Sequence, residues 1–293
     1  MRRFVLAAAM AGMTFGAQAA DLPDLPVLRG SLPPGGLSTQ MRNWDGFYVG
    51  GQLGYASGEM DFSHSVRSLT NFILRNSVLQ APVEQWALLS KNHAQATSFG
   101  AFVGRNWQWD DIVFGVEANY TYLTNLQSES KNSMTRIIPG EAAPVGHTLS
   151  YVTTLAGRAG LQLKDVITFR GRTGWVVGNA LPYVFGGLAV GRTDVSREAS
   201  VSYDKFDDYD TSVTVGGVTT ITHHHDFLGS AVLSSNDKRS NSFVPGWTAG
   251  LGMEYCLWGG LFMRGEWEYT RFMNVKDITF STNQVRLGVG YKF

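Results

Sequence analysis

The sequence predicts an all-β fold, an eight-stranded antiparallel up-and-down transmembrane β-barrel with long extracellular loops. Three observations predict it. Apolar residues alternate with polar or small residues in eight segments, as in strands that turn one face to lipid and one to a lumen. Short and long connections alternate strictly between these segments, and aromatic side chains gather near both ends of the strands.

The composition of the chain narrows the class of protein. Its 293 residues suffice for one large all-β domain, and its 24 basic and 24 acidic residues cancel, so no excess of positive charge favours nucleic acid. After the N-terminus, no apolar run approaches the ~20 residues of a membrane-spanning helix. A membrane crossing therefore requires a closed sheet, which satisfies its own backbone hydrogen bonds. The single cysteine, Cys256, excludes an internal disulfide and a Cys-based zinc site.

The N-terminus has the pattern of an exported protein. Residues 1–19 combine two early arginines, an apolar run over 4–16 and the cleavage box Ala17-Gln18-Ala19, so we expect a signal peptide cut after Ala19, with Ala20 as the alternative. Residues 20–43 are rich in proline and glycine, which predicts a flexible periplasmic leader. The barrel domain is then expected over 44–293.

The first three strands are predicted over 44–56, 97–109 and 112–123. Every second side chain in them is apolar or aromatic, and the positions between hold mainly glycine and polar residues. A tight turn at Asp110-Asp111 joins the second strand to the third. The third strand places Glu117 opposite its aromatic face, so this carboxylate is expected in the lumen.

The fourth and fifth strands are predicted over 166–177 and 181–191, around a short turn at Gly178-Asn179-Ala180. Residues 149–164, just before them, also alternate in part. We interpret this stretch as an extension of the fourth strand above the membrane or as a small element in the second loop. A barrel of ten strands is the alternative.

The last three strands are predicted over 243–255, 261–272 and 283–293, and the last is expected to pair with the first. Its apolar residues fall at every second position and end on an aromatic one. The short turns are expected in the periplasm and the long connections outside the cell, as in outer-membrane barrels. These long connections are predicted as loops over residues 57–96, 124–165, 192–242 and 273–283.

Charged residues on the inward faces balance. A barrel of eight strands has an interior just wide enough for side chains to fill, where unpaired charges are costly. We expect a polar plug of paired charges; the alternative is a narrow gated pore in which Arg and Glu exchange partners. The four acids and four bases are Glu117, Glu254, Glu266, Glu268, Arg170, Arg172, Arg264 and Arg286.

Aromatic residues are predicted to form two girdles at the membrane interfaces, where Trp and Tyr are enriched. The periplasmic girdle is assigned to Trp44, Trp107, Trp175 and Trp258. The outer girdle is assigned to Tyr120, Tyr122, Trp247 and Tyr269.

The long connections carry further local signals. Apolar residues within 66–89 recur at helical spacing, which predicts an amphipathic helix over the mouth or at the lipid headgroups, with an irregular loop as the alternative. Gly216-Gly217 predicts a hairpin. His223-His224-His225 would point alternately along a strand and so form a poor metal site. We expect no metal, no cofactor and, without G-x-S-x-G, H-E-x-x-H or P-loop motifs, no enzyme activity.

Several segments resemble the outer-membrane immunogenic-protein family of alphaproteobacteria, an OmpA-like barrel group that includes porin-like and haemin-binding proteins. The resemblance rests on WDGFYVGGQLGYASG, FVGRNWQW, VFGVEANYTYL and VRLGVGYKF, among others. It implies an eight-stranded barrel at the cell surface with a structural or weak porin role. Some relatives bind haemin, but this property maps onto no residue here. The chain departs from the family at Arg105, where an aromatic residue is usual, and at residues 149–164.

The resemblance also implies a location and partners. We expect a protein of the bacterial outer membrane that contacts lipid, lipopolysaccharide and the barrel assembly machinery. A monomer is favoured although the sequence does not determine the oligomeric state, and the balanced charge predicts no binding of nucleic acid. Tyr291 and Phe293 would form the assembly signal. The leading hypothesis is a structural surface barrel without chemistry; the alternatives are a small-solute porin and a protein that binds haemin or another ligand, or adheres, through its loops.

Overall fold

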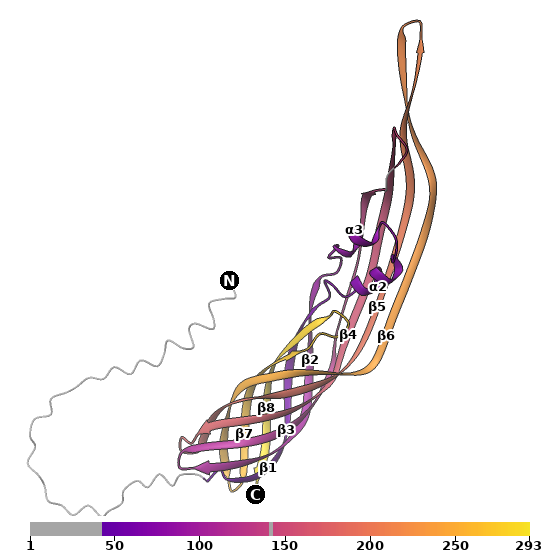
Figure 1. The fold of residues 1–293 in the computed structure, drawn as a ribbon. Helices are drawn as coiled ribbons and strands as arrows, with labels where there is room; N and C mark the ends of the chain where they lie inside the picture. The colour runs from indigo at the N-terminus through magenta and orange to yellow at the C-terminus, as the bar shows by residue number, and fades with distance from the viewer. Residues whose placement is uncertain (1–42, 141–142) are drawn as a thin grey trace, which may run out of the picture. The chain divides into compact units, whose positions relative to one another are not determined.

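The computed structural model describes residues 43–140 and 143–293, so the expected signal peptide and almost all of the expected leader lie outside the described residues. Eight antiparallel strands follow one another in sequence order around a closed ring, and the last pairs with the first (Figure 1). The predicted all-β barrel of eight strands is therefore confirmed. The tight turns at Asp110–Asp111 and Gly178–Asn179 lie where the sequence predicts them, and Gly259–Gly260 form the turn between the predicted strands 243–255 and 261–272.

Two short helices interrupt the first long connection, and the other elements of the described residues are strands. Within the described residues, no helix is long and apolar enough to cross a membrane. The helices are α2 (Arg67–Ile73) and α3 (Gln80–Glu84). The strands are β1 (Gly46–Asp61), β2 (Lys91–Trp109), β3 (Ile112–Pro139), β4 (His147–Trp175), β5 (Ala180–Val215), β6 (Val218–Trp258), β7 (Leu261–Phe272) and β8 (Thr279–Lys292).

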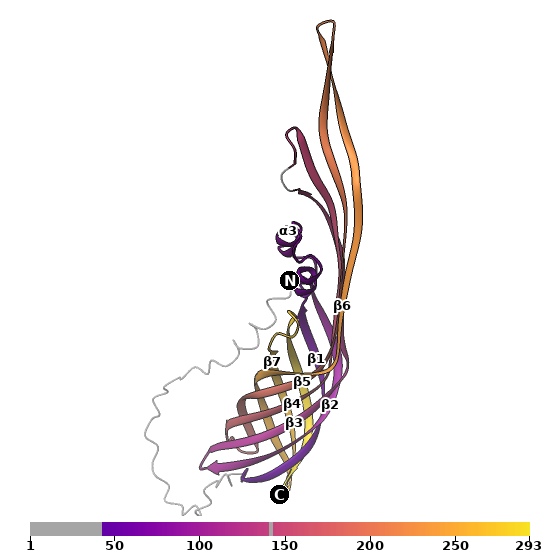
Figure 2. The same cartoon turned by 45° about the vertical axis from the view of Figure 1, so that its right-hand side comes forward.

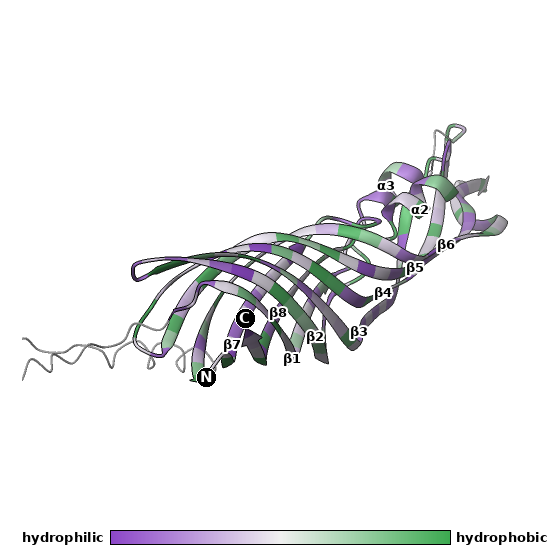
Figure 3. Cartoon of the chain, turned by 90° about the horizontal axis from the view of Figure 1, so that it is seen from below, coloured by the Kyte–Doolittle hydropathy of each residue, from purple (hydrophilic) through white to green (hydrophobic). Residues whose placement is uncertain are grey.

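The barrel is apolar outside and polar inside. Outward side chains such as Leu53 and Leu287 are 69% and 67% exposed, whereas inward residues such as Gln52 and Glu254 are buried. Figure 3 shows the resulting alternation of apolar and polar residues along the strands. This is the arrangement of a barrel whose outer face meets hydrocarbon, because such strands alternate apolar-out and polar-in.

Two of the predicted long loops are wrong. Residues 124–165 and 192–242 mostly continue the strands, and β3, β4, β5 and β6 remain paired as a sheet far beyond the other four (Figure 2). Residues 149–164 belong to β4, which is one of the two interpretations, and residues 43–140 and 143–293 form no ninth or tenth strand. The β5–β6 ribbon turns at Gly216–Gly217, whose φ angles of 62° and 84° need glycine, so the predicted hairpin is confirmed.

A register shift at Lys164 explains why the extension was hard to recognise. Below it, even-numbered residues of β4 such as Thr168 face the lumen; above it, odd-numbered residues such as Leu161 face the same side. A bulge inserts one residue and so reverses which positions face inward. The apolar face also changes sides, because outside the bilayer the exposed face meets water and the inner face forms a core.

This core is an apolar cap, which we define as residues 62–89 together with the buried face of the sheet extension. Val66, Leu69 and Val83 of the helical segment belong to one buried cluster with Leu155 and Leu161 of β4. Two short helices thus replace the single predicted one, and they pack against the buried face of the sheet extension. The apolar side chain of Phe72 in α2 does not join this cluster, because it is exposed.

Polar contacts fasten the cap to the sheet. The buried guanidinium of Arg197 donates to the carbonyl oxygen of Ser65 at 2.7 Å and to the Asp237 carboxylate at 2.8 Å. Hydrogen bonds from Lys276 and Arg197 hold the pKa of Asp237 below its ordinary value. These contacts join the β1–β2 connection, β5, β6 and the β7–β8 connection at one point.

The cap can be tested at Leu155, whose side chain is 1% exposed beneath the helices. Leu155→Ala should destabilise the cap by about 2–5 kcal/mol, because the truncation leaves a cavity in a packed core. We expect faster hydrogen exchange and faster proteolysis within residues 62–89 while the barrel keeps its heat-modifiable gel mobility. Arg158→Ala, on the opposite face of the same strand, is the control and should change neither rate appreciably. Equal effects of the two variants would contradict the packing described here.

Candidate functional site

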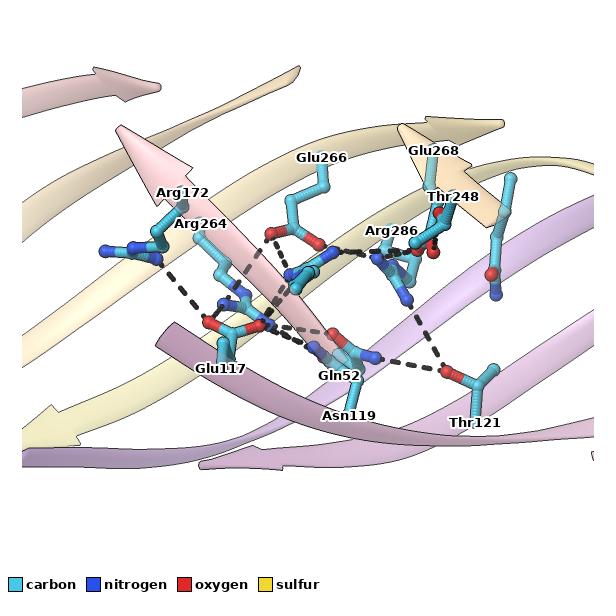
Figure 4. A network of polar contacts seen from close by, with 12 residues as sticks. Gln52, Glu117, Asn119, Thr121, Arg172, Thr248, Arg264, Glu266, Glu268 and Arg286 are labelled. Atoms are coloured by element: carbon cyan, nitrogen blue, oxygen red, sulfur yellow. Dashed lines mark hydrogen bonds and ion pairs between the residues drawn. The ribbon is translucent and has the colours of Figure 1, made fainter. Parts of the chain in front are cut away.

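The eight predicted lumen charges lie together inside the barrel. Glu117 comes from β3, Arg170 and Arg172 from β4, Glu254 from β6, three residues from β7 and Arg286 from β8. Their side chains are at most 3% exposed, and each forms an ion pair with at least one other member of the set. Figure 4 shows most of this charge network together with its polar neighbours.

Glu117 is the most connected member. Its carboxylate accepts hydrogen bonds from Arg170 Nη2 at 2.6 Å and from Arg264 Nη1 at 2.7 Å. The phenol of Tyr48 donates to its Oε2 at 2.7 Å, and the amide of Asn119 donates to its Oε1 at 2.6 Å. Arg264 also donates to Gln52 at 3.1 Å. One carboxylate thus links four strands across the lumen.

The second part of the network extends toward the outer end of the barrel. Glu266 accepts from Arg286 at 2.8 Å and also from Arg170 and the Tyr183 phenol. Glu268 forms an ion pair with Arg286 and accepts from the hydroxyl of Thr248. Arg286 therefore joins two carboxylates of β7, which places the closing strand within the network.

The third part is a bidentate pair. Arg172 donates through Nη1 and Nη2 to the two oxygens of Glu254 at 2.6 and 2.7 Å. Its guanidinium also lies over the rings of Tyr48 and Tyr183, with 4.9 and 4.5 Å to the ring centroids. A planar guanidinium suits both contacts, since it matches a carboxylate edge-on and an aromatic ring face-on.

An aromatic floor lies at the periplasmic end of the lumen, and the alternation of the strands does not predict it as a unit. We define the floor as Trp44, Tyr48, Phe102 and Phe262, which are all buried. The ring of Phe262 lies 6.0–6.3 Å from the three others, in tilted or edge-on geometry. Such pairs stabilise the packing beyond the burial of their area, and here they join three strands and the segment before β1 beneath the charges.

The assignment of Trp44 to a girdle was wrong. Its side chain is 3% exposed and packs against Phe262 inside the barrel. The residue precedes β1, so the alternation of the strand does not fix its direction, and its backbone N–H donates to Gln108 Oε1 at 2.6 Å. The seven other girdle residues point outward with partly or fully exposed side chains: Trp107, Trp175, Trp258, Tyr120, Tyr122, Trp247 and Tyr269.

Glycines on the inward face give the signal that could have revealed the floor. A Cβ at Gly290 would lie 2.4 Å from the Phe262 ring, and one at Gly104 would lie 2.2 Å from the Tyr48 hydroxyl. Both positions must remain without a side chain, because the rings occupy that space. Small inward residues facing an inward aromatic on a neighbouring strand therefore predict a ring that crosses the lumen.

The remaining predicted residues lie outside the lumen. Tyr291 is exposed on the outer face, and Phe293 follows β8 with its N–H donating to the carbonyl of Phe47 at 2.8 Å. His223 and His225 each pair with an aspartate across the β5–β6 ribbon, and His147 pairs with Asp207. In the part of the chain that the structure describes, no three His, Cys, Asp or Glu side chains converge as a metal site.

The arrangement limits what the lumen can do chemically. Every carboxylate of the charge network has an arginine partner, so none is left as an isolated acid or base. Removing one partner of a buried ion pair is far more costly than never having buried the pair. The network is therefore suited to holding strands in place.

The chain is similar to known outer-membrane proteins. The family described as "Outer membrane protein beta-barrel domain" matches residues 5–293. The chain is 27% identical over 197 residues to the 25 kDa outer-membrane immunogenic protein of Brucella ovis, which covers 66% of this chain and 62% of that protein. The protein of the same name from Brucella canis is 25% identical over 205 residues, covering 66% and 64%. The chain thus spans less than two thirds of the length of these relatives.

Among solved structures, Neisserial surface protein A aligns with a TM-score of 0.30 and 12% identity, covering 84% of this chain and 97% of that one. Ail, the attachment invasion locus protein of Yersinia pestis, aligns with a TM-score of 0.28 and 9% identity, covering 84% and 99%.

The central role of Glu117 can be tested with Glu117→Gln, which replaces the carboxylate with a neutral amide of similar shape. Glu117→Gln leaves Arg170 and Arg264 with one carboxylate fewer in a buried site, and we expect a loss of about 3–5 kcal/mol in unfolding free energy. The measurement is urea unfolding in micelles, followed by gel mobility and tryptophan fluorescence. Glu129→Gln removes the exposed pair with Arg158 and should cost less than about 1 kcal/mol. Similar losses of unfolding free energy in both variants would contradict a central role of Glu117 in the charge network.

Proposed function

The chain belongs to the outer membrane protein β-barrel domain family, and from this premise we propose that it is a closed structural barrel that displays a sheet at the cell surface. It is a protein of the bacterial outer membrane. The proposal is supported by three successive layers of buried side chains along the barrel. These are the aromatic floor, the charge network and the apolar cap.

The inward side chains of β1 meet all three layers in order. Tyr48 belongs to the floor and also reaches the charge network through Glu117. Gln52 accepts from Arg264 within the network, and Ala56 and Met60 belong to the cap cluster. A solute would have to displace rings, paired charges and a packed apolar core in turn. This sequence of barriers supports a barrel that does not conduct.

The small-solute porin is the weaker alternative. Opening the middle layer requires buried ion pairs to separate, and a broken pair costs about 3–5 kcal/mol. An exchange of partners would avoid most of this cost, because Arg170 and Arg264 each lie near two or more carboxylates. Such exchanges would produce only brief and narrow openings, and the floor and cap would still obstruct both ends.

A specific observation favours adhesion or ligand binding as a second function. The β5–β6 ribbon continues far past the barrel, and near its tip Val213, Val215 and Val218 are 63–73% exposed. These three side chains lie on one face of the ribbon, since Val215 pairs directly with Val218 and Val213 is two residues away. Exposed aliphatic groups on a polar ribbon are a feature of contact surfaces.

Conductance tests the closed barrel. In planar bilayers, the purified protein should show no steady channel, or only small and intermittent steps. A variant with residues 62–89 replaced by a short Gly-Ser linker should remain closed as well, because the floor and the charge network are intact. A large and steady conductance of the unmodified protein would refute the closed barrel.

Shortening the ribbon tests the second function. A variant in which residues 210–223 are replaced by Asn-Gly joins Tyr209 to His224, which are already paired, and should fold as before because the pairing of β4 with β5 is kept. We expect bacteria that express it to adhere to epithelial monolayers less than bacteria that express the unmodified protein. The control Ile221→Thr alters the opposite face of the ribbon. Unchanged adherence of the shortened protein at equal surface expression would argue against a contact role for the ribbon.

A further inference from the structure

Arg105 is a positive charge on the outer face of the barrel that the charge network does not use. It lies on β2, where its exposed guanidinium is 4.8 Å from the ring centroid of Phe47 and 5.2 Å from that of Trp107. Among residues 43–140 and 143–293, no carboxylate pairs with it. The two rings shield the cation but supply no negative charge.

Its position along the barrel sets Arg105 apart from the other outward charges. Arg105 precedes the turn at Asp110–Asp111 by a few residues, so it lies in the periplasmic half of the wall. The other outward charges on the strands lie at the outer rim or beyond it, as Arg271 and the Asp165–Arg192 pair do. An outward arginine is costly at the bilayer midplane but tolerated near an interface, where lipid phosphates lie.

A groove of about 460 Å³ begins at Arg105. Arg105 lies directly opposite Phe47 on β1 and Val116 on β3, and Val116 lies opposite Gly171 on β4. The side chain of Phe169 stands beside Gly171, which has none. Apart from Arg105, the outward side chains that line the groove are apolar, so the groove combines one cation with a hydrocarbon surface.

The row of small outward residues continues past the groove. Gly171 pairs with Gly186 of β5, which pairs with Ala249 of β6. Arg105 lies four residues from the periplasmic end of β2, whereas Ala249 lies nine residues from that of β6, so the row rises toward the bilayer centre. Four strand spacings span roughly 19 Å. One leaflet of a core that is ~30 Å thick is about 15 Å, so an inclined acyl chain matches this length.

We propose that this groove binds one glycerophospholipid of the periplasmic leaflet, with its phosphate on Arg105 and an acyl chain over Val116, Gly171 and Gly186. The guanidinium supplies the paired donors that a phosphate accepts, and Phe47 and Trp107 keep it oriented. The positions of the charged and apolar ends of the groove determine which leaflet supplies the lipid. The charged end lies near the periplasmic turns, and the apolar end lies toward the bilayer centre. The site lies outside the lumen and is independent of the closed-barrel proposal.

Native mass spectrometry of the purified full-length protein in micelles tests the site with two probes. Phosphatidylglycerol and diacylglycerol with the same acyl chains differ only in the headgroup. The unmodified protein should retain phosphatidylglycerol about ten-fold more tightly than diacylglycerol, because only the former carries the phosphate. Arg105→Gln should reduce this difference to near unity, and Arg105→Lys should restore part of it.

Gly171→Leu tests the apolar part of the same site. A Cβ at this position would meet no atom within 4 Å, so the barrel should fold while the side chain fills the groove. We expect weaker retention of both probes, in contrast to the headgroup-specific effect at Arg105. Arg271→Gln removes an outward arginine from the outer rim and should leave both affinities unchanged. Heat-modifiable mobility confirms folding of every variant.

Three results would overturn the proposal. The first is equal retention of phosphatidylglycerol by the unmodified protein and Arg105→Gln. The second is an equal loss of phosphatidylglycerol retention in Arg271→Gln, which would indicate that any outward positive charge attracts this lipid. The third is a change from dimer to monomer in Arg105→Gln without a change in lipid retention, which would assign the groove to a second copy of the chain.

Discussion

The contacts of Glu117 across the lumen are the interaction on which the structure depends most. Backbone hydrogen bonds join each strand only to its two neighbours, and they leave the cross-section of a closed ring free to distort. Glu117 on β3 binds Arg264 on β7 and Tyr48 on β1, neither of which is on a strand adjacent to β3. A network of this kind is strong only when every member has a partner, since a half-satisfied one costs more than an apolar interior.

The layers above and below the network follow from the surroundings of each level. At the periplasmic end the lumen holds buried rings, and these need glycines such as Gly104 and Gly290 opposite them. Beyond the outer rim, the outward face of the sheet meets water instead of lipid, so apolar residues move to the inner face. The shift at Lys164 brings Leu163 and Leu161 to that face, and residues 62–89 cover it.

Most of the barrel could be predicted because alternation within a strand fixes the direction of each side chain. That rule placed Arg170 and Glu254 in the lumen and Trp107 and Tyr269 on the outside. It failed at Trp44, which precedes the strand, and at residues 124–165 and 192–242, where the apolar face changes sides. The partners within the network could not be predicted either, because the register of non-adjacent strands is a property of the closed ring and not of any one segment.

The two kinds of arginine in this barrel obey one physical rule. Arg170 and Arg264 lie over the rings of Phe185 and Phe102, at 3.9 and 3.3 Å from the centroids, and both also contact carboxylates. Arg105 has the rings of Phe47 and Trp107 but no acid from the described chain. An aromatic ring offsets only part of the loss of hydration of a guanidinium, so each lumen arginine adds an anion. Arg105 faces the membrane near its polar boundary, and the anions available there are the phosphates of the lipid itself.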